Sequence, residues 1–221
     1  MQKFETTAPI TAVLDIPAGR IRFVAGDESE TTVEVRPADA AKKRDVKAAE
    51  QTTVGFAGGV LRIEAAEAKS QIFGNSGYVD VTVRLPAGSR VEGKAAAADF
   101  RGVGRFGEVV FEAAQGPIDI DEAASARLTL AAGDVSVGRL TGAAEVSVSK
   151  GDVRIVEAVR GRVVLRTQMG AISVGAAAGV SAALNAGAAY GRVENSLKND
   201  GSVELDIHAT TSYGDIVARS L

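Results

Sequence analysis

Four aspartates in a glycine-rich repeated pattern come nearest to a chemical site. Asp99, Asp134, Asp152 and Asp215 occupy equivalent places in that pattern, and Asp134 and Asp152 fall in consecutive copies. Neighbouring strands lie about 4.8 Å apart, so stacked carboxylates would repel one another unless a cation such as Ca²⁺ lay between them. The calcium-binding nonapeptide of β-rolls is absent, and aspartate commonly caps turns. The pattern favours turn capping over a metal site.

His208 is the only histidine, and the 221 residues contain no cysteine. It lies in a strand-like segment, VELDIHATT, where the spacing places no obvious partner beside it. Zinc sites, redox-metal sites, cysteine nucleophiles and disulfides are therefore not expected, and no serine lies in a G-x-S-x-G elbow. We expect His208 to be structural, the protein not to be an enzyme, and no cofactor or metal to be bound.

One segment, Gly102–Gly107, has the spacing G-x-G-x-x-G that dinucleotide-binding folds use. A dinucleotide site needs a helix directly after these glycines, whereas a strand-like segment, Glu108–Phe111, follows here. No Walker pattern is present either. The sequence does not support nucleotide binding.

The residues directly before the glycines of the repeated pattern become larger and more apolar toward the C-terminus. They are Gln115, Ala132, Lys150, Met169, Tyr190 and Tyr213. Met169, Tyr190 and Tyr213 would form an apolar strip, for which the pattern favours a stacked corner that packs inward over a protein interface. With Asp215, Ile216 and Val217 of the last strand, these three form the candidate interaction surface.

The glycines belong to a repeat of glycine, a small or polar residue, and then an apolar–polar–apolar strand. Six copies start at Gly116, Gly133, Gly151, Gly170, Gly191 and Gly214, at steps of 17, 18, 19, 21 and 23 residues, and the copies at Gly191 and Gly214 are looser. An imperfect earlier copy lies at 98–102. Repeats near 20 residues built from short strands are typical of solenoids. An antiparallel sandwich is the alternative.

Each repeat also contains an earlier strand, such as Leu128–Leu130 or Val163–Leu165. Because strand side chains alternate, the residues two and four after each glycine share a face. Val135, Val153 and Ile172 should therefore stack in one parallel, buried column.

We expect residues 1–88 to form strands with a helical insertion. This N-terminal part should continue directly into the repeats over 89–221, so that the whole chain forms one structural unit. The expected strands are Thr11–Ile16, Arg20–Val24, Thr31–Arg36 and Tyr78–Leu85, with turns at Pro17-Ala18-Gly19 and Gly26-Asp27. A short solvated helix with Asp39 as N-cap is expected over about 39–51. A hairpin of Thr52–Phe56 and Val60–Ala65 and a loop at Lys69–Gly77 complete this part.

Composition narrows the class of protein. Hydrophobic residues make up 46% and charged residues 24%, as in ordinary folded proteins, and the net charge of −3 gives no footprint for nucleic acid. Aromatic residues are 5% with no tryptophan, so sugar- or base-stacking platforms are sparse. No signal peptide or apolar segment of transmembrane length is seen, so we expect a cytoplasmic protein without membrane insertion.

Three features of the chain are shared with a known family: the GDV and GDI strands, Val83–Ser89 (VRLPAGS) and Thr210–Leu221 (TTSYGDIVARSL). On these features, and over nearly its whole length, the sequence resembles the bacterial "putative adhesin", or Toast-rack, family of β-strand-repeat proteins of largely unknown function. The resemblance implies an all-β fold, a single-stranded right-handed parallel β-helix, and an association with envelope-stress and surface proteins.

Three functions follow as hypotheses. The first is a non-enzymatic β-solenoid scaffold, adhesin-like, that binds an unknown protein partner. The second is a carbohydrate-binding or degenerate lyase-like β-helix, and the third is a solenoid that self-assembles end to end. Because a solenoid must protect its last strand, we expect the C-terminal coil, Val203–Leu221, to be the interaction end.

Overall fold

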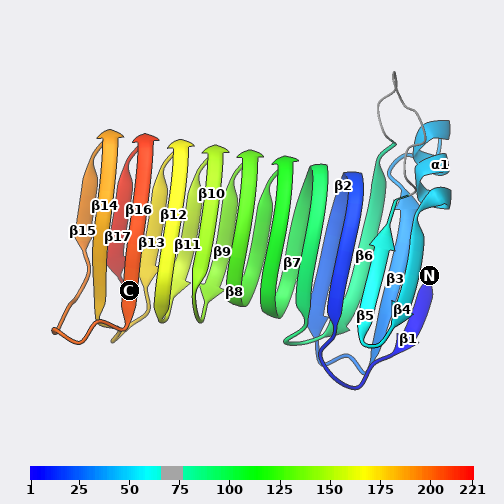
Figure 1. The fold of residues 1–221 in the computed structure, drawn as a ribbon, viewed down its shortest axis with the longest axis horizontal. Coiled ribbons are helices and arrows are strands. Elements are labelled where there is room, and N and C mark those ends of the chain that lie inside the picture. The colour runs from blue at the N-terminus through cyan, green and yellow to red at the C-terminus, as the bar shows by residue number, and fades with distance from the viewer. Residues whose placement is uncertain (66–76) are drawn as a thin grey trace.

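The computed structural model describes residues 1–65 and 77–221, most of which are extended strands (Figure 1). The predicted loop at Lys69–Gly77 lies, apart from Gly77, outside the described residues. Within these two ranges no helix is long and apolar enough to cross a membrane. The elements in chain order are β1 (Gln2–Glu5), β2 (Thr11–Gly26), β3 (Glu30–Pro37), α1 (Lys43–Gln51), β4 (Thr53–Ala57), β5 (Val60–Glu64), β6 (Val79–Pro86), β7 (Arg90–Gln115), β8 (Ile118–Ala132), β9 (Val135–Leu140), β10 (Ala144–Lys150), β11 (Val153–Ala158), β12 (Gly161–Met169), β13 (Ile172–Ala176), β14 (Ala182–Tyr190), β15 (Val193–Ser196), β16 (Leu205–Tyr213) and β17 (Ile216–Ser220).

Strands in the repeat region alternate between two ladders, so each repeat contributes one strand to each ladder. In the first ladder β8, β10, β12, β16 and β14 pair in parallel in that order. In the second ladder the order is β8, β9, β11, β13, β17 and β15. The long strands β2, β7 and β8 take part in both ladders and join them into one mainly parallel sheet. The all-β class with one short helix is confirmed.

The inner faces of the two ladders form one continuous apolar core. Val153 is in register with Val135 on one side and with Ile172 on the other, and none of the three is more than 1% exposed. The predicted buried column is therefore confirmed. The parallel pairing also rules out an antiparallel sandwich for this region, because strands of such a sandwich run in alternating directions.

Glycine marks the corner where the chain passes from the first ladder to the second. Gly151 has a φ of 146°, and a Cβ added there would lie 2.0 Å from the carbonyl oxygen of Gly133 in the preceding repeat. Only glycine combines this backbone angle with so close an approach of two chains. The predicted role of the repeated glycines at corners is confirmed.

The N-terminal part departs from the prediction at one corner. Thr11–Ile16 and Arg20–Val24 are two arms of β2, and Pro17-Ala18-Gly19 is not a turn. The chain stays extended there because the first arm pairs with β5 in one ladder and the second arm pairs with β6 in the other. The predicted hairpin of β4 and β5 is confirmed.

Helix α1 begins at Lys43, so the predicted N-cap at Asp39 was wrong. Asp39 Oδ1 instead accepts a hydrogen bond from Ala41 N at 3.0 Å, which closes a local turn before the helix. Asp45 is the buried residue of the helix, and its Oδ1 accepts a hydrogen bond from Tyr78 N at 3.0 Å. This bond ties α1 to the beginning of β6.

The last two strands of the chain do not lie at the end of the ladders. Strand β16 lies between β12 and β14, and β17 lies between β13 and β15. Figure 1 shows the orange strands β14 and β15 outside the red strands β16 and β17. We call β14 and β15 the terminal repeat, and β16 and β17 the inserted repeat. The expectation that Val203–Leu221 is the interaction end assumed an unpaired last strand, and that assumption was wrong because β17 is paired on both sides.

Candidate functional site

Three side chains on neighbouring strands form an exposed apolar row at the glycine corner, which we call the corner strip: Met169, Tyr213 and Tyr190. Tyr213 is in register with Met169 on one side and with Tyr190 on the other. The exposed fractions are 53%, 56% and 66% in that order. The predicted strip is present, with Tyr213 in the middle because its repeat is the inserted one. The inward packing that the pattern favoured for these three residues was wrong.

The two tyrosine rings of the corner strip stack on each other. Their centroids are 4.9 Å apart and their planes differ by 5°. Stacking holds each ring in one orientation, so less conformational entropy is lost when a partner binds. The strip is a preformed surface on three strands that pair with one another.

The other three residues predicted for the interaction surface are held within the sheet. Ile216 is fully buried, in register with Ile172 and Val193, and Val217 is half-buried. Asp215 Oδ1 accepts a hydrogen bond from Arg192 N at 2.8 Å. All three lie in or beside β17, which pairs on both of its edges, so they do not extend the corner strip.

The repeated aspartates bond to the backbone of the next repeat. Asp134 Oδ1 accepts a hydrogen bond from Asp152 N at 2.8 Å, and Asp152 Oδ1 accepts one from Ala171 N at 2.8 Å. Asp99 has no such donor, because the equivalent position in the next repeat, directly before Ile118, is Pro117, which lacks an N–H. The carboxylates thus cap the neighbouring repeat, whereas the sequence predicted that they cap their own turn.

The geometry gives these aspartates no metal-binding partners. In the described part of the chain, no three histidine, aspartate or glutamate side chains gather closely enough to hold an ion. The backbone N–H of Arg192 holds the pKa of Asp215 below its ordinary value, and the Arg192 guanidinium, 3.5 Å from Asp215 Oδ2, adds to this effect. Asp215 is therefore a carboxylate adapted to accepting a backbone hydrogen bond.

His208 has two polar neighbours that the sequence analysis missed. Its Nε2 lies 2.9 Å from Asp206 Oδ2 and 3.3 Å from Arg162 Nη2. Asp206 is two residues earlier on the same strand, and the period of two that predicts a shared face would have found it. In register, His208 lies between Val164 and Asn185, which offer no nucleophile. The cluster is a partly exposed polar network across β12 and β16.

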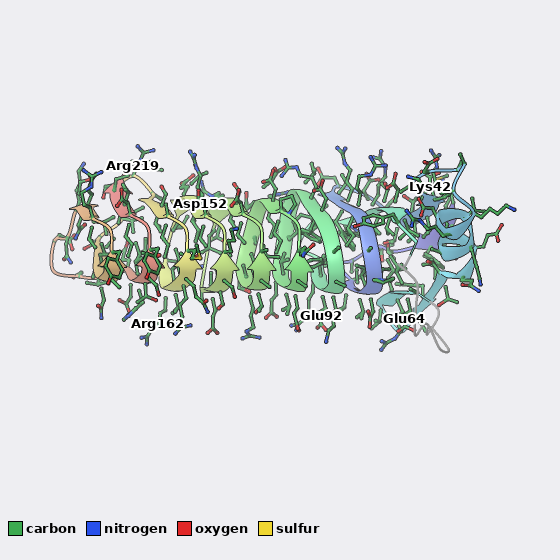
Figure 2. The ribbon with its side chains drawn as sticks, turned by 90° about the horizontal axis from the view of Figure 1, so that it is seen from above. Lys42, Glu64, Glu92, Asp152, Arg162 and Arg219 are labelled. Carbon is green, nitrogen blue, oxygen red and sulfur yellow. The ribbon has the colours of Figure 1, made fainter. Side chains whose placement is uncertain are left out.

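The outer faces of the ladders carry balanced charge. Figure 2 shows Glu64, Glu92 and Arg162 pointing from one face, and Arg219 from the opposite side. Ion pairs bridge neighbouring repeats, as between Arg139 and Glu157 at 2.8 Å. Because the pairs are exposed, each contributes little stability. Their mixed signs give neither face the character of a polysaccharide groove.

Several solved structures are similar to this chain. A "putative adhesin" from Bacteroides fragilis is 14% identical with a TM-score of 0.51, and the alignment covers 98% of this chain and 95% of that one. A "putative cell adhesion protein" from Clostridium sporogenes is 14% identical with a TM-score of 0.38, covering 100% and 98%. A "putative adhesin" from Parabacteroides distasonis is 13% identical with a TM-score of 0.36, covering 98% and 95%. At this identity, the Bacteroides fragilis structure bears on the fold alone.

The sequence itself places the chain among known families. Comparison with curated proteins gave no match. The sequence profile of one family, however, matches residues 13–220, which include every repeat and most of the N-terminal strands. The chain belongs to the Toastrack DUF4097 family.

Proposed function

We propose that the protein is a non-enzymatic, adhesin-like scaffold that binds a protein partner through the corner strip. The scaffold in this proposal is a β-solenoid, right-handed as the family resemblance implies. The two parallel ladders and the glycine corner support it, because a chain that adds one strand to each ladder per repeat winds around a common core. Such a framework presents side chains at fixed spacing along its axis.

The corner strip is the observation that carries the binding role. Met169, Tyr213 and Tyr190 are all more than half exposed on three consecutive strands. Methionine and tyrosine are enriched in protein interfaces, where they bury large apolar area. A protein surface with its own apolar patch is the partner that this row fits.

A second candidate, carbohydrate binding, is favoured by the tyrosine pair. Tyr190 has the most exposed side chain of the strip at 66%, and only one face of its ring is covered by Tyr213. The apolar face of a sugar ring packs on an aromatic ring that is exposed in this way. In this second candidate function, the same residues bind a carbohydrate instead of a protein.

Site-specific photo-crosslinking in the native host separates the two candidates. A photoreactive amino acid at Tyr213 should give a covalent adduct with one discrete protein, and the same group at Glu145, on the outer face of β10, should not. The Tyr190→Ala variant should weaken that adduct. Absence of an adduct, or the same adduct from both positions, would contradict the protein-binding proposal. Retention on a glycan array that is lost in Tyr190→Ala would support the carbohydrate candidate instead.

A further inference from the structure

The two ends of the ladders are protected differently. At the N-terminal end, Phe4 of β1 packs against Phe56 of β4, with ring centroids 5.4 Å apart, and both rings cover the core. Strand β1 also carries Lys3 and Glu5, and β4 is only five residues long. Short strands and charged side chains are the devices by which proteins blunt a sheet edge. This end is sealed.

The other end presents the terminal repeat. Among the described strands, none pairs with the outer edge of β14 or of β15. Strand β15 has four residues and carries Glu194. Strand β14, with the sequence AALNAGAAY, has nine residues and contains no charged residue and no proline. It is therefore the one long edge in the described chain that lacks the usual protection.

The unpaired backbone groups of β14 are few and well defined. Leu205 N donates to Ser181 O, so by the alternation of a parallel pair Ala183, Asn185 and Gly187 face β16. The N–H and C=O groups of Leu184, Ala186 and Ala188 then point away from the sheet. Both flanks are occupied, because Ala182 N donates to Lys198 O and Tyr190 O accepts from Gly214 N, each at 2.9 Å. The free segment is centred on Ala186.

We infer that β14 pairs with β14 of a second copy of this chain, antiparallel and centred on Ala186, to form a closed dimer. In that register Leu184 lies opposite Ala188 of the second copy, and Ala186 lies opposite its own equivalent. Every N–H and C=O group left free at these three residues gains a partner on both copies. A second copy of this chain is therefore sufficient to pair the free backbone groups of β14.

The side chains of β14 suit the same arrangement. Leu184, Ala186 and Ala188 pack against the core from its end and stay partly exposed there. In the dimer the larger leucine of each copy faces the smaller alanine of the other, so the two cores meet without crowding. Since β14 carries no charge, two copies approach without repulsion between like charges.

A two-fold pairing consumes the edge on both copies, so assembly stops at two. Sealing of the N-terminal end also opposes the head-to-tail stacking that a filament needs. The dimer therefore differs from the end-to-end filament that the sequence left open. It is also separable from the proposed function by experiment, because Ala186→Pro removes an N–H of β14 and does not replace Met169, Tyr213 or Tyr190.

Sedimentation across a range of concentrations tests the dimer. The mean mass should rise from that of one chain, 22.6 kDa, to a plateau at two chains. Ala186→Pro removes the central N–H, which points away from β16, so the fold should persist while the dimer is lost. Circular dichroism verifies the fold, and Thr210→Lys, one strand inward on an exposed position, should leave the dimer intact.

Disulfide trapping tests the register, since the chain has no cysteine of its own. Asn185 and Gly187 of the second copy would form a non-hydrogen-bonded pair, with Cα atoms about 4.5 Å apart, which suits a disulfide. A mixture of Asn185→Cys and Gly187→Cys proteins should oxidise to a covalent dimer faster than either variant alone. A strict monomer, growth beyond two chains, an intact dimer in Ala186→Pro, or no preference for the mixed pair would each overturn the inference.

Discussion

Arg192 donates its backbone N–H to Asp215 Oδ1 at 2.8 Å, although Arg192 comes 23 residues earlier in the chain. In the other two bonds of this kind the later residue is the donor, as in Asp152 N to Asp134 Oδ1. The direction along the axis is nevertheless the same in all three, because each carboxylate accepts from the repeat that lies farther from the N-terminal end. At Arg192 the donor comes before the acceptor in the sequence, because β16 and β17 are inserted between the preceding repeat and the terminal repeat.

The carboxylate of Asp152 should contribute to stability through its bond to Ala171 N. Asp152→Ala leaves that N–H without its acceptor, and we expect the free energy of unfolding to fall by about 1 kcal/mol. Asp152→Asn keeps an acceptor oxygen and should lose less. Urea unfolding measures the change, with Asp99→Ala as the matched control, since its neighbour Pro117 has no N–H to lose. Equal losses in Asp152→Ala and Asp99→Ala would contradict this role.

Gly151 should tolerate no side chain. Its φ is 146°, and an added Cβ would lie 2.0 Å from Gly133 O. A side chain at this position would therefore force the two repeats apart. We expect Gly151→Ala to lower the free energy of unfolding by about 3 kcal/mol or more. Gly187→Ala is the control, because nothing lies within 4 Å of a Cβ at that position. Thermal unfolding followed by circular dichroism compares them, and similar melting temperatures for the two variants would count against a close-approach role.

Val153→Asp should prevent folding. The substitution places a charge between Val135 and Ile172, both at most 1% exposed, where no partner compensates it. The expected loss exceeds about 4 kcal/mol, so the variant should be insoluble or lack the strand signal in circular dichroism. Val156→Asp, at a position 41% exposed on the same strand, should fold normally. A soluble, folded Val153→Asp protein would mean that the column is not packed.

The low pKa of Asp215 predicts a specific sensitivity to acid. Its backbone hydrogen bond from Arg192 lowers the pKa in the folded state below the ordinary value of 3.8. The unfolded chain then binds the proton more readily, so the stabilisation is present above the ordinary pKa and is lost as the pH falls through the folded one. The difference in unfolding free energy between the protein and Asp215→Asn should shrink below about pH 4. Urea titrations at several pH values measure it, and a constant difference would refute the linkage.

Much of the local structure was predictable because the pattern of residues dictates it. Glycine at each corner and apolar residues two and four positions later determine which side chains face inward, since strand side chains alternate. The column through Val135, Val153 and Ile172 follows from that rule alone. The corner at Pro17-Ala18-Gly19 was not predictable, because whether such a segment turns back or stays extended depends on the strands that it meets, β5 and β6.

The sequence by itself determined the repeat, its corners and the identity of the buried face, because these depend on neighbours a few residues away. The order of the last two repeats was decided only by the tertiary structure. Parallel strands with similar patterns pair almost equally well, so total burial selects between the alternatives. Leu205 and Ile207 gain complete burial inside the sheet, whereas the terminal repeat holds smaller residues and Asn195 at a position that is apolar in the other repeats. That choice places Tyr213 between Met169 and Tyr190 and leaves the edge of β14 open.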